Sequence, residues 1–402
     1  MKVVILAAGE GTRMRPLTAS KPKVMLPIAN KPMMEHTINA AVAAGIREFL
    51  IVTGYREDAI MEYFKNGSHL GISVEYVHQE EQLGTANAIG CAKDYVKGHF
   101  IVLNGDMLVS TEHIRHLISR SEDAIISVKE VEDPSQFGVI ENNEERVTRI
   151  IEKPKKPATN LANAGIYLFD DVIFEYIDKT GKSKRGEYEI TDSLQMMIDD
   201  GCSVGYEILT SDWIDIGRPW DMLDANKVLL ENIDNTHEGT VEPYATLHGN
   251  VRVGKNTIIR NGAYIVGPVV IGENCDIGPN CFIRPSTAIG NDVHIGNAVE
   301  IKNSIIMDGT KIGHLSYLGD SVIGTACNFG AGTKVANLRH DNKNVKSMVK
   351  GELVDTGRRK LGVIMGDDVH TGINTSINIG TVMEPGSSTM PGEVVMYKRK
   401  TN

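Results

Sequence analysis

Long hydrophobic runs are missing from this 402-residue sequence, and no stretch approaches the roughly twenty apolar residues of a membrane-spanning helix. The apolar run at the N-terminus is also too short for a signal peptide. The formal net charge is −10, with 52 acidic and 42 basic residues. This balance argues against nucleic acid or an anionic membrane as the main partner, because binding either one requires a basic surface. We therefore expect a soluble, cytoplasmic protein with neither kind of partner.

Cysteine is also scarce, with five residues, an odd number, and no Cys-x-x-Cys spacing. This pattern predicts neither a disulfide framework nor a zinc site, and we expect buried thiols. The composition is otherwise ordinary apart from 40 glycines. The length is sufficient for two domains, each with its own core.

The glycine-rich turn near the N-terminus is the first candidate site. An apolar run from Val3 to Leu6 predicts a buried strand, and Gly9-Glu10-Gly11-Thr12 follows it directly. Exposed backbone N–H groups, a hydroxyl and four nearby cations predict a phosphate cradle, the cations being Arg13, Arg15, Lys21 and Lys23. The string is neither a Walker sequence nor a dinucleotide fingerprint. Taken alone, Gly-x-Gly after a strand is equally compatible with a simple tight turn.

The longer string changes that balance. Leu6-Ala-Ala-Gly-Glu-Gly-Thr-Arg13, Pro16-Leu17-Thr18, Lys21-Pro22-Lys23 and Lys31-Pro32-Met33 together resemble the signature of sugar-phosphate nucleotidylyltransferases. These enzymes join a sugar 1-phosphate to a nucleoside triphosphate. The resemblance implies that Arg13 and Lys23 stabilise charge on the phosphates during catalysis. It also implies that the nucleotide is bound by Leu6, Ala8, Gly9, Gly11 and Thr12.

The residues after this loop alternate between apolar, strand-like runs and helical segments. Helices are expected at 33–44, 58–65 and 85–96, and strands at 48–52, 73–77 and 100–103. This order predicts right-handed βαβ units in a mostly parallel, doubly wound α/β sheet of Rossmann-like type, forming a domain at 1–235. Ligands bind at the carboxyl ends of the strands in such sheets.

Two loops at those strand ends carry candidate chemistry. The segment from Gln79 to Ala86 follows a strand and opens a helix, so Gln79 could read a base edge, whereas Thr85 could simply cap the helix. The family resemblance favours nucleotide binding by Gln79, Gly84 and Thr85. Asp106 ends the next strand, where a carboxylate can hold Mg²⁺, although an isolated aspartate there is often a turn residue.

The resemblance extends into the second half of this domain. Phe137-Gly138-Val139, Glu152-Lys153-Pro154 and the run from Asn163 to Tyr167 are similar to the sugar-binding elements of the family. The implied sugar-binding residues are Gly138, Glu152, Lys153 and Asn163. The stretch from Arg185 to Asp192 also resembles a family element, and Asp215 is implied to join Asp106 on the Mg²⁺.

The remaining 160 or so residues follow a six-residue period. Twelve consecutive positions at this spacing are apolar, namely Val241, Leu247, Val253, Ile259, Ile265, Ile271, Ile277, Ile283, Ile289, Ile295, Ile301 and Met307. Such hexapeptide repeats predict a left-handed parallel β-helix at 236–402, with the aliphatic side chains stacked inside. We expect the frame to slip by one residue at Ile312 and again at Ile323, and the segment 336–362 to leave the coils as a loop.

Polar residues in these coils resemble the acetyltransferase half of bifunctional N-acetylglucosamine-1-phosphate uridylyltransferases. The match consists of Arg284, Lys302, the run from Gly313 to Asp320 that contains His314 and Tyr317, the run from Asn328 to Gly332, Asn337 and Lys343. The resemblance implies that His314 is the base as an aminosugar 1-phosphate attacks acetyl-CoA, a task suited to its ordinary pKa of about 6.5. Arg284 and Lys302 would hold the sugar phosphate, with Tyr317 assisting. Asn328, Asn337 and Lys343 would complete the sugar pocket or steady the oxyanion by hydrogen bonds. A homotrimer is also implied.

Some features depart from the bacterial enzymes of that family. The segment 335–341 differs, the basic excursion at 344–362 is longer, and His340 could share or alter the role given to His314. A lone histidine can also be purely structural.

We expect a bifunctional enzyme with Mg²⁺ as cofactor. One half would transfer a nucleotidyl group from UTP or dTTP to N-acetylglucosamine 1-phosphate or glucose 1-phosphate, and the other would N-acetylate glucosamine 1-phosphate with acetyl-CoA. With UTP the final product would be UDP-N-acetylglucosamine. One alternative is a glucose-1-phosphate thymidylyl- or uridylyltransferase with a trimerising or regulatory β-helix. Another is a regulatory protein that binds sugar nucleotides without turnover, against which the intact Arg13, Lys23, Asp106 and Asp215 argue.

Overall fold

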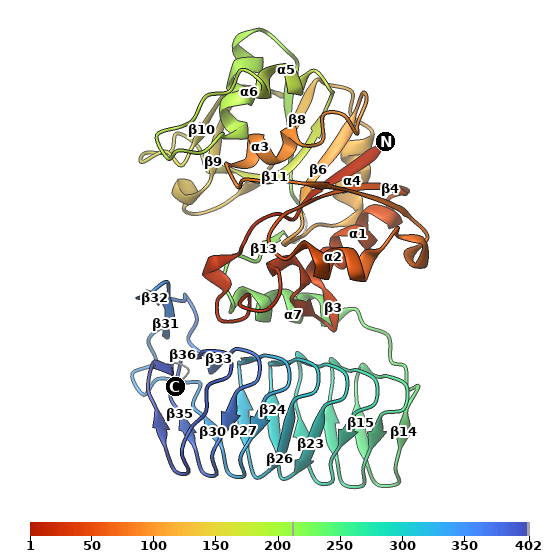
Figure 1. Cartoon of the computed structure of the whole chain (residues 1–402), viewed down its shortest axis with the longest axis vertical. Coiled ribbons are helices and arrows are strands. Elements are labelled where there is room, and N and C mark those ends of the chain that lie inside the picture. The colour runs from red at the N-terminus through yellow and green to blue at the C-terminus, as the bar shows by residue number, and fades with distance from the viewer. Residues whose placement is uncertain (211–212, 400–402) are drawn as a thin grey trace. The chain divides into compact units, whose positions relative to one another are not determined.

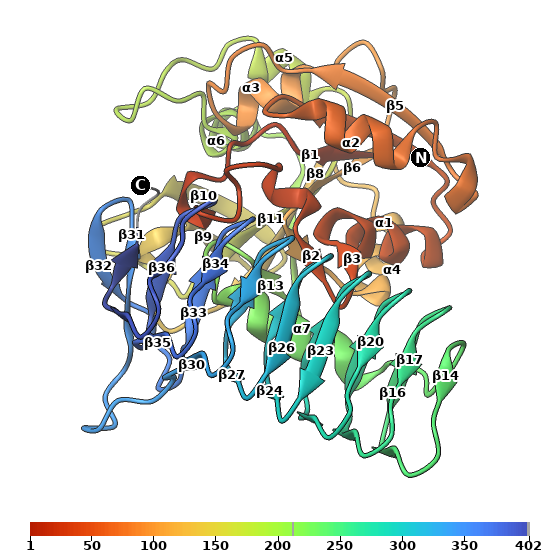
Figure 2. The same cartoon turned by 60° about the horizontal axis from the view of Figure 1, so that its bottom comes forward.

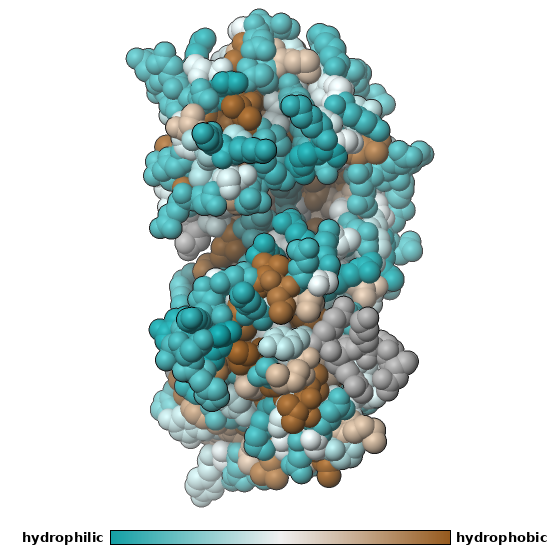
Figure 3. Space-filling model, turned by 90° about the vertical axis from the view of Figure 1, so that its left-hand side faces the viewer, coloured by the Kyte–Doolittle hydropathy of each residue, from teal (hydrophilic) through white to brown (hydrophobic). Residues whose placement is uncertain are grey.

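The computed structural model describes residues 1–210 and 213–399 and contains two compact units (Figure 1). The first unit comprises Met1–Glu10 and Met33–Asp215, and the second comprises Gly11–Pro32 and Ile216–Asn402. The domain boundary expected between residues 235 and 236 remains a prediction. In the described part of the chain, no helix is both long enough and apolar enough to cross a membrane. On the face shown in Figure 3, hydrophilic side chains predominate and hydrophobic ones form small separate patches.

A nine-stranded sheet forms the first unit, in the order β5-β4-β1-β6-β11-β8-β12-β10-β9. Its strands are β1 (Lys2–Leu6), β4 (Glu48–Thr53), β5 (Ser73–His78), β6 (Phe100–Asn104), β8 (Ala124–Glu130), β9 (Gly138–Asn143), β10 (Arg146–Glu152), β11 (Leu161–Phe169) and β12 (Val204–Ile208). The strands β5, β4, β1 and β6 are mutually parallel, whereas β11 runs antiparallel to β6 and β8, and β10 runs antiparallel to β9 and β12. The sheet is therefore mixed, with β5, β4, β1 and β6 as its parallel half, and the expectation of a mostly parallel sheet is wrong.

Helices cover both faces of this sheet. They are α1 (Met33–Ala43), α2 (Glu57–Phe64), α3 (Thr85–Gly90), α4 (Thr111–Ile118), α5 (Ile173–Ile177) and α6 (Ile190–Asp199). Val4 packs in one core with α3, α5 and α6, and its neighbours Val3 and Ile5, which point to the other face, are equally buried. On that other face α1 and α4 pack against each other. The predicted doubly wound α/β architecture is confirmed.

The helix expected at 85–96 is shorter than predicted. It ends at Gly90, and residues 91–95 form turns. The amides of Ala92, Lys93 and Tyr95 each donate to the carbonyl three residues earlier, which is a tighter winding than that of an α-helix. A glycine in the helix interior favours such an early end.

Three parallel sheets form most of the second unit. In the described residues each coil contributes one short strand to each sheet, except that the last coil adds none to the first sheet. The first sheet contains β14 (Thr240–Val241), β17 (Ile258–Ile259), β20 (Asp276–Ile277), β23 (His294–Asn297), β26 (Lys311–His314), β29 (Asn328–Phe329) and β34 (His370–Thr371). The second contains β15 (Thr246–His248), β18 (Tyr264–Val266), β21 (Phe282–Ile283), β24 (Glu300–Lys302), β27 (Tyr317–Gly319), β30 (Lys334–Val335), β35 (Ser376–Ile377) and β37 (Val394–Val395). The third contains β16 (Val251–Val253), β19 (Val269–Ile271), β22 (Thr287–Ile289), β25 (Ile305–Ile306), β28 (Val322–Ile323), β33 (Val363–Met365), β36 (Thr381–Met383) and β38 (Lys398–Arg399).

The interior of these coils is a column of buried aliphatic side chains, with the stacked strands visible in Figure 2. The predicted hexapeptide β-helix is therefore confirmed. Cys275, Cys281 and Cys327 lie in or beside this column as free, buried thiols, and burial raises the pKa of Cys281 and of Cys327 to about 12. Segment 11–32 and helix α7 (Asp221–Glu231) also belong to this unit. There the Asn226 amide donates to Ser286 O at 3.0 Å and accepts from the Ala29 amide at 2.9 Å.

Two coils are one residue shorter than the others, and the first shortening comes earlier than expected. Ile271 pairs with Ile289, 18 residues on, but Ile289 pairs with Ile306, 17 residues on. Ile306, and not Met307, therefore occupies the inward position. The lost residue lies in the corner between the second and third sheets, where Asn303 takes a left-handed φ of 44°.

A second shortening follows at the same corner one coil later, where Ile306 pairs with Ile323 and Asp320 has a φ of 53°. One coil further on, the chain leaves the stack at Asn337 and returns at Gly362. This excursion includes a hairpin of β31 (Lys346–Val349) and β32 (Glu352–Asp355) that projects from the coils (Figure 1). The expected loop outside the solenoid is confirmed.

Candidate functional sites

The loops after β1, β4 and β5 converge on Ala8 in the first unit. The Ala8 carbonyl accepts hydrogen bonds from the Gln82 side chain at 2.7 Å and from the Tyr55 amide at 3.1 Å. The loop after β6 is tied to the same strand end, because the Gly105 amide donates to Leu6 O at 3.0 Å. Within the described residues, no atom lies within 4 Å of the place where a Gly9 Cβ would be. The backbone at Gly9 is thus open to close approach by a ligand.

Gly84 and Thr85 lock one of these loops to a distant segment. A Cβ on Gly84, which has a φ of 119°, would lie only 2.5 Å from Tyr188 O. The Thr85 hydroxyl accepts a hydrogen bond from the Ile190 amide at 3.0 Å. Gly84, not Thr85, is the N-cap of α3, so the alternative that Thr85 caps the helix is wrong. Gln79 is 6% exposed, and its amide donates to Asn87 Oδ1 at 2.6 Å.

The two predicted metal ligands lie at two paired strands, Asp215 on one and Asp106 in the turn directly before the other. Strand β13 (Ile214–Asp215) pairs with β7 (Met107–Leu108) so that Asp215 is opposite Met107, the residue after Asp106. Asp106 is half-buried and Asp215 is exposed. Carboxylate pairs of this kind suit Mg²⁺, which keeps several waters and is completed by substrate phosphates. In the described part of the chain no cluster of three or more acidic, histidine or cysteine side chains could hold a metal alone.

Three of the predicted sugar-binding residues meet across strands β9, β10 and β11. Gly138 is paired with Glu152, and a Cβ on Gly138 would lie 3.1 Å from Glu152 Oε2 and 3.4 Å from the Asn163 Cβ. The Asn163 amide donates to the Tyr167 hydroxyl at 2.8 Å. Lys153 Nζ lies 3.6 Å from Glu152 Oε1. The strands therefore bring together all four residues of this predicted group.

Arg185 joins this group from a neighbouring loop. Its guanidinium lies 3.2 Å from each of the Glu152, Glu187 and Glu189 carboxylates. Burial, with the charge of Glu152, raises the pKa of the Glu189 carboxyl. The stretch from Arg185 to Asp192, for which the family resemblance also implies a sugar contact, is therefore in direct contact with the predicted sugar-binding residues.

The second half of the N-terminal signature belongs to the second unit. A Cβ on Gly11 would lie 2.8 Å from the Lys23 Cβ, and the Gly11 carbonyl accepts hydrogen bonds from the Thr18 hydroxyl and the Met14 amide. Lys23 is 8% exposed, whereas Arg13 is exposed and Thr12 is half-buried.

Lys21 was expected to be one of the cations of the phosphate cradle, but its side chain is paired with other residues of the protein. Its ammonium donates to the Thr325 hydroxyl at 2.9 Å and lies 3.5 Å from the Asp367 carboxylate, which also accepts from Ser20. These partners belong to the coils of the β-helix. Lys21 therefore anchors its loop within the second unit.

A polar cluster on the second sheet contains three predicted acetyltransferase residues. The Asn337 amide donates to the Tyr317 hydroxyl at 3.2 Å and to Asp320 Oδ2 at 2.6 Å. Lys302 Nζ lies 3.9 Å from the same Asp320 oxygen, and Asn303 donates to the other at 2.7 Å. Asp320 is 3% exposed and lies at the centre of the cluster, although the sequence analysis gave it no role. The slips in the six-residue period were the sequence signal that could have identified these residues, because each slip lies at the corner that contains Asn303 or Asp320.

Gly319 is a second residue of the matching run 313–320 to which the sequence analysis gave no role. It pairs with Lys302 across the sheet. A Cβ on Gly319 would lie 2.5 Å from Asn337 Nδ2 and 2.6 Å from the Tyr317 hydroxyl. Only glycine leaves room for these two side chains to meet.

Arg284 is one coil away from Lys302. Its guanidinium donates to Glu300 at 2.9 Å and lies over the Phe282 ring at 5.6 Å. Burial, opposed by the charge of Asp320 and reinforced by Lys360 and Arg284, lowers the pKa of the Lys302 ammonium. Burial also raises the pKa of the Tyr317 hydroxyl.

His314, Asn328 and Lys343 lie apart from this cluster. His314 ends β26 and Asn328 begins β29, both on the first sheet, and both side chains are exposed. The His314 carbonyl accepts from Ser316 and Gly332, while its ring makes no hydrogen bond within the described residues. Lys343 is exposed in the excursion, where its amide donates to Asp341.

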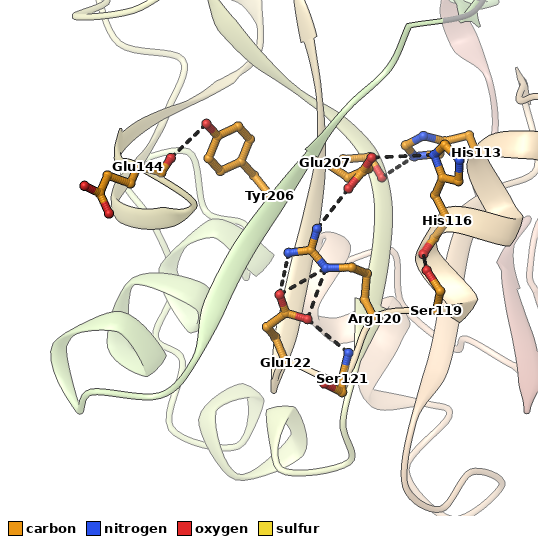
Figure 4. A network of polar contacts seen from close by, with 10 residues as sticks. His113, His116, Ser119, Arg120, Ser121, Glu122, Glu144, Tyr206 and Glu207 are labelled. Atoms are coloured by element: carbon orange, nitrogen blue, oxygen red, sulfur yellow. Dashed lines mark hydrogen bonds and ion pairs between the residues drawn. The ribbon is translucent and has the colours of Figure 1, made fainter.

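A further polar network lies in the first unit and includes no predicted site residue (Figure 4). Arg120 is paired with Glu122 and, at 3.1 Å, with Glu207, and this arrangement lowers the pKa of the Glu122 carboxyl to about 2. His113 is 4% exposed, and its Nε2 lies 2.8 Å from the Ser127 hydroxyl. Burial, with a smaller effect of His116, lowers the pKa of His113 to about 4.

Comparison with known proteins matches both halves of the chain. Residues 2–232 match the family described as nucleotidyl transferase, and residues 265–388 match the GMPPB C-terminal domain. The chain is 43% identical over 381 residues to the bifunctional protein GlmU of Methanocaldococcus jannaschii, covering 94% of this chain and 91% of that protein. The chain belongs to the bifunctional GlmU family.

Other members of this family are similarly close. The bifunctional sugar-1-phosphate nucleotidylyltransferase/acetyltransferase of Sulfurisphaera tokodaii is 41% identical over 401 residues, covering 98% of this chain and 97% of that protein. A solved structure titled as a putative glucose-1-phosphate thymidylyltransferase from Bacillus anthracis is 31% identical, with a TM-score of 0.53, and covers 58% of this chain and 96% of that one. GlmU-family membership confirms both resemblances seen in the sequence.

Proposed function

We propose that the chain is a bifunctional enzyme that makes UDP-N-acetylglucosamine. Its N-terminal half transfers a uridylyl group from UTP to N-acetylglucosamine 1-phosphate and releases pyrophosphate. Its C-terminal half transfers acetyl from acetyl-CoA to glucosamine 1-phosphate. The observation that carries the second activity is the polar cluster of Lys302, Tyr317 and Asn337 around Asp320, since a β-helix that only trimerises has no need of it.

In the nucleotidyl transfer, a phosphate oxygen of the sugar phosphate attacks the α-phosphorus and pyrophosphate leaves. No general base is required, because the attacking phosphate is already ionised near neutral pH. Positioning and charge neutralisation supply the acceleration, with Arg13 and Lys23 stabilising the phosphate charge. Asp106 and Asp215 would hold Mg²⁺, which orients and neutralises the triphosphate when it is bound.

Other residues of the first unit position the two substrates. The loop that Gln82 ties to Ala8 brings Gln79, Gly84 and Thr85 towards the nucleotide base. Glu152 and Asn163 hydrogen-bond sugar hydroxyls beside Gly138, and Lys153 lies beside them. Uracil and thymine differ by a single methyl group, which changes the binding free energy in an apolar pocket by only about 1–3 kcal/mol. The nucleotide dTTP is therefore a candidate second substrate.

In the acetyl transfer, the sugar amine attacks the thioester carbonyl and a C–N bond replaces the C–S bond. His314 accepts the amine proton and returns it to the departing CoA sulfur. Arg284 and Lys302 bind the sugar phosphate, and Tyr317, Asn328 and Asn337 contact the sugar or the developing oxyanion. By sequence register Lys343 is also assigned to this pocket.

We also propose a homotrimer in which each acetyl-transfer site is shared between protomers. The support is the separation of His314 and Asn328, on the first sheet, from the cluster around Asp320 on the second. Co-expressing His314→Ala chains with Lys302→Met chains tests this arrangement. Mixed trimers should recover part of the acetyl transfer that each variant lacks alone, whereas a site contained in one protomer would give no recovery. A cytoplasmic location stays a prediction.

The decisive experiment follows free CoA thiol when the purified protein meets glucosamine 1-phosphate and acetyl-CoA. We expect sugar-dependent release that is lost in His314→Ala, together with pyrophosphate release from UTP and N-acetylglucosamine 1-phosphate in both proteins. If neither glucosamine nor galactosamine 1-phosphate promotes thiol release, the chain is a nucleotidylyltransferase with a trimerising or regulatory β-helix.

A further inference from the structure

The last residues of the excursion are fixed against the acetyl-transfer cluster. Leu338 and Lys360 form an antiparallel bridge, and the Leu361 amide donates to Asn337 O at 3.0 Å. On its other side, the Gly362 amide donates to Asp320 O at 2.8 Å. A Cβ on Gly362 would lie 2.2 Å from the Ser321 hydroxyl oxygen, so the backbone there is in close contact with the coil. The two residues that follow Lys360 are thus hydrogen-bonded to two residues of the cluster, which fixes the backbone of Lys360 beside it.

A pocket opens beside this return segment. It is lined by Asp320 together with Arg358, Arg359 and Lys360, and on one side by Asp224. Asp224 is already paired with Arg358 at 2.5 Å. The Arg358 Nε is buried and has no hydrogen-bond partner among the described residues. The pocket therefore presents mainly donors and positive charge.

Around Asp320 the positive charges of the lysines outnumber the single negative charge of its carboxylate. Lys302 and Lys360 lie close enough for Lys360 to disfavour the charged form of Lys302, and Asp320 is the carboxylate between them. That carboxylate also accepts hydrogen bonds from the side-chain amides of Asn303 and Asn337. Arg284, the next cation, is paired with Glu300. An anion with two negative charges would relieve the repulsion between the two ammonium groups.

We infer that Lys360, held at the return of the excursion, binds the phosphate of the aminosugar 1-phosphate together with Lys302. This inference rests on the proposed acetyl transfer and adds a residue to its site. It also changes the role expected for the excursion, because Lys343 was assigned by counting forward from Asn337. The excursion inserts residues between that asparagine and the point where the chain rejoins the coils. The spacing from Asn337 alone therefore does not determine whether Lys343 or Lys360 lies beside the cluster.

The test compares Lys360→Met with Lys350→Met, which removes the same charge at the exposed tip of the hairpin. We expect Lys360→Met to raise the KM for glucosamine 1-phosphate about 10- to 100-fold, the range for losing a charged hydrogen bond. The KM for acetyl-CoA and the rate of nucleotidyl transfer should not change. Lys360→Arg should recover most of the loss, and Lys350→Met should match the wild type.

Lys343→Met decides between the two assignments. A KM increase for glucosamine 1-phosphate in Lys343→Met with none in Lys360→Met would overturn the inference, as would a wild-type KM in Lys360→Met. Calorimetric titration with glucosamine 1-phosphate and with inorganic phosphate separates this inference from the proposed function. If the wild type lacks acetyl transfer, weaker binding of either probe by Lys360→Met still supports the anion site. Equal binding by both proteins, or no binding by the wild type, contradicts it.

Discussion

The candidate sites of the two units are built in different ways. In the first unit the residues come from loops at strand ends, so Ala8, Gln82 and Tyr55 meet although they lie far apart in the sequence. In the β-helix the residues lie on or just beyond the strands themselves, and Lys302 and Gly319 are neighbours because one coil separates them. A loop-built site is thus recognised by its contiguous motif, whereas a coil-built site is recognised by its spacing.

The first test of this contrast removes one side chain from the loop-built site. Asp106→Ala should reduce nucleotidyl transfer by at least about 10²-fold, because the triphosphate loses one of its two metal-holding carboxylates. Acetyl transfer should be unaffected. Pyrophosphate and CoA-thiol assays on the same preparation measure both. Full nucleotidyl transfer in this variant would remove Asp106 from the site.

The second test adds one methyl group to the coil-built site. Gly319→Ala should lower acetyl transfer about 10- to 100-fold, because its Cβ would push Asn337 away from Tyr317. Gly313→Ala is the matched control, since nothing in the described structure lies within 4 Å of its Cβ and it adjoins His314. Equal activity of the two variants would mean that the contact between Asn337 and Tyr317 does not matter.

The third test concerns stability in acid, which should differ between the units. Buried His113 in the first unit has a pKa lowered to about 4 from 6.5. As the pH falls through this window, the unfolded chain takes up a proton that the folded chain does not, so stability is lost. Below pH 4 the free energy of unfolding should be lower by about 3 kcal/mol because of this one group. The histidines of the β-helix are all at least partly exposed.

Thermal unfolding at pH 7.5 and at pH 5 measures this difference. His113→Gln, which can still hydrogen-bond Ser127, should lose less thermal stability between the two pH values than the wild type. His370→Gln, at an exposed histidine of the β-helix, should behave as the wild type does. If His113→Gln is as acid-sensitive as the wild type, burial of His113 is not the cause.

The smallest expected effect comes from Thr85. Thr85→Val removes the acceptor of the Ile190 amide and should cost about 1 kcal/mol of unfolding free energy, while Thr85→Ser should retain it. Denaturant unfolding measures both. A large loss of nucleotidyl transfer in Thr85→Val at unchanged stability would instead point to direct contact with the nucleotide.

The sequence predicted the contiguous features of both units well. The alternation of strands and helices in the first unit and the hexapeptide coils were expected, and the family resemblance implied the grouping of Gly138, Glu152 and Asn163. A local pattern is sufficient in these cases, because the period of apolar residues decides which face is buried. The order of the nine strands in the sheet was not predicted. The chain's membership of the GlmU family confirms the resemblances that the motifs suggested.

The features that the sequence did not predict depend on contacts between distant segments. Gly84 must be glycine because of Tyr188, and no spacing rule relates these residues. Asp320 lies at the centre of its cluster only because two successive corners each lose one residue. Likewise, Ile323 pairs with Met365 across the excursion, and the six-residue period before the excursion does not predict which later residue resumes the register. Roles for most individual site residues remain predictions.

The excursion also offers a place to alter the protein. Both of its ends are attached at one corner of the coil stack, and its hairpin turns at Lys350 and Gly351, which have φ values of 50° and 89°. Added length at this turn would extend away from the paired strands and leave the coil register untouched. We therefore expect a peptide tag inserted at the turn to label the enzyme while retaining both activities.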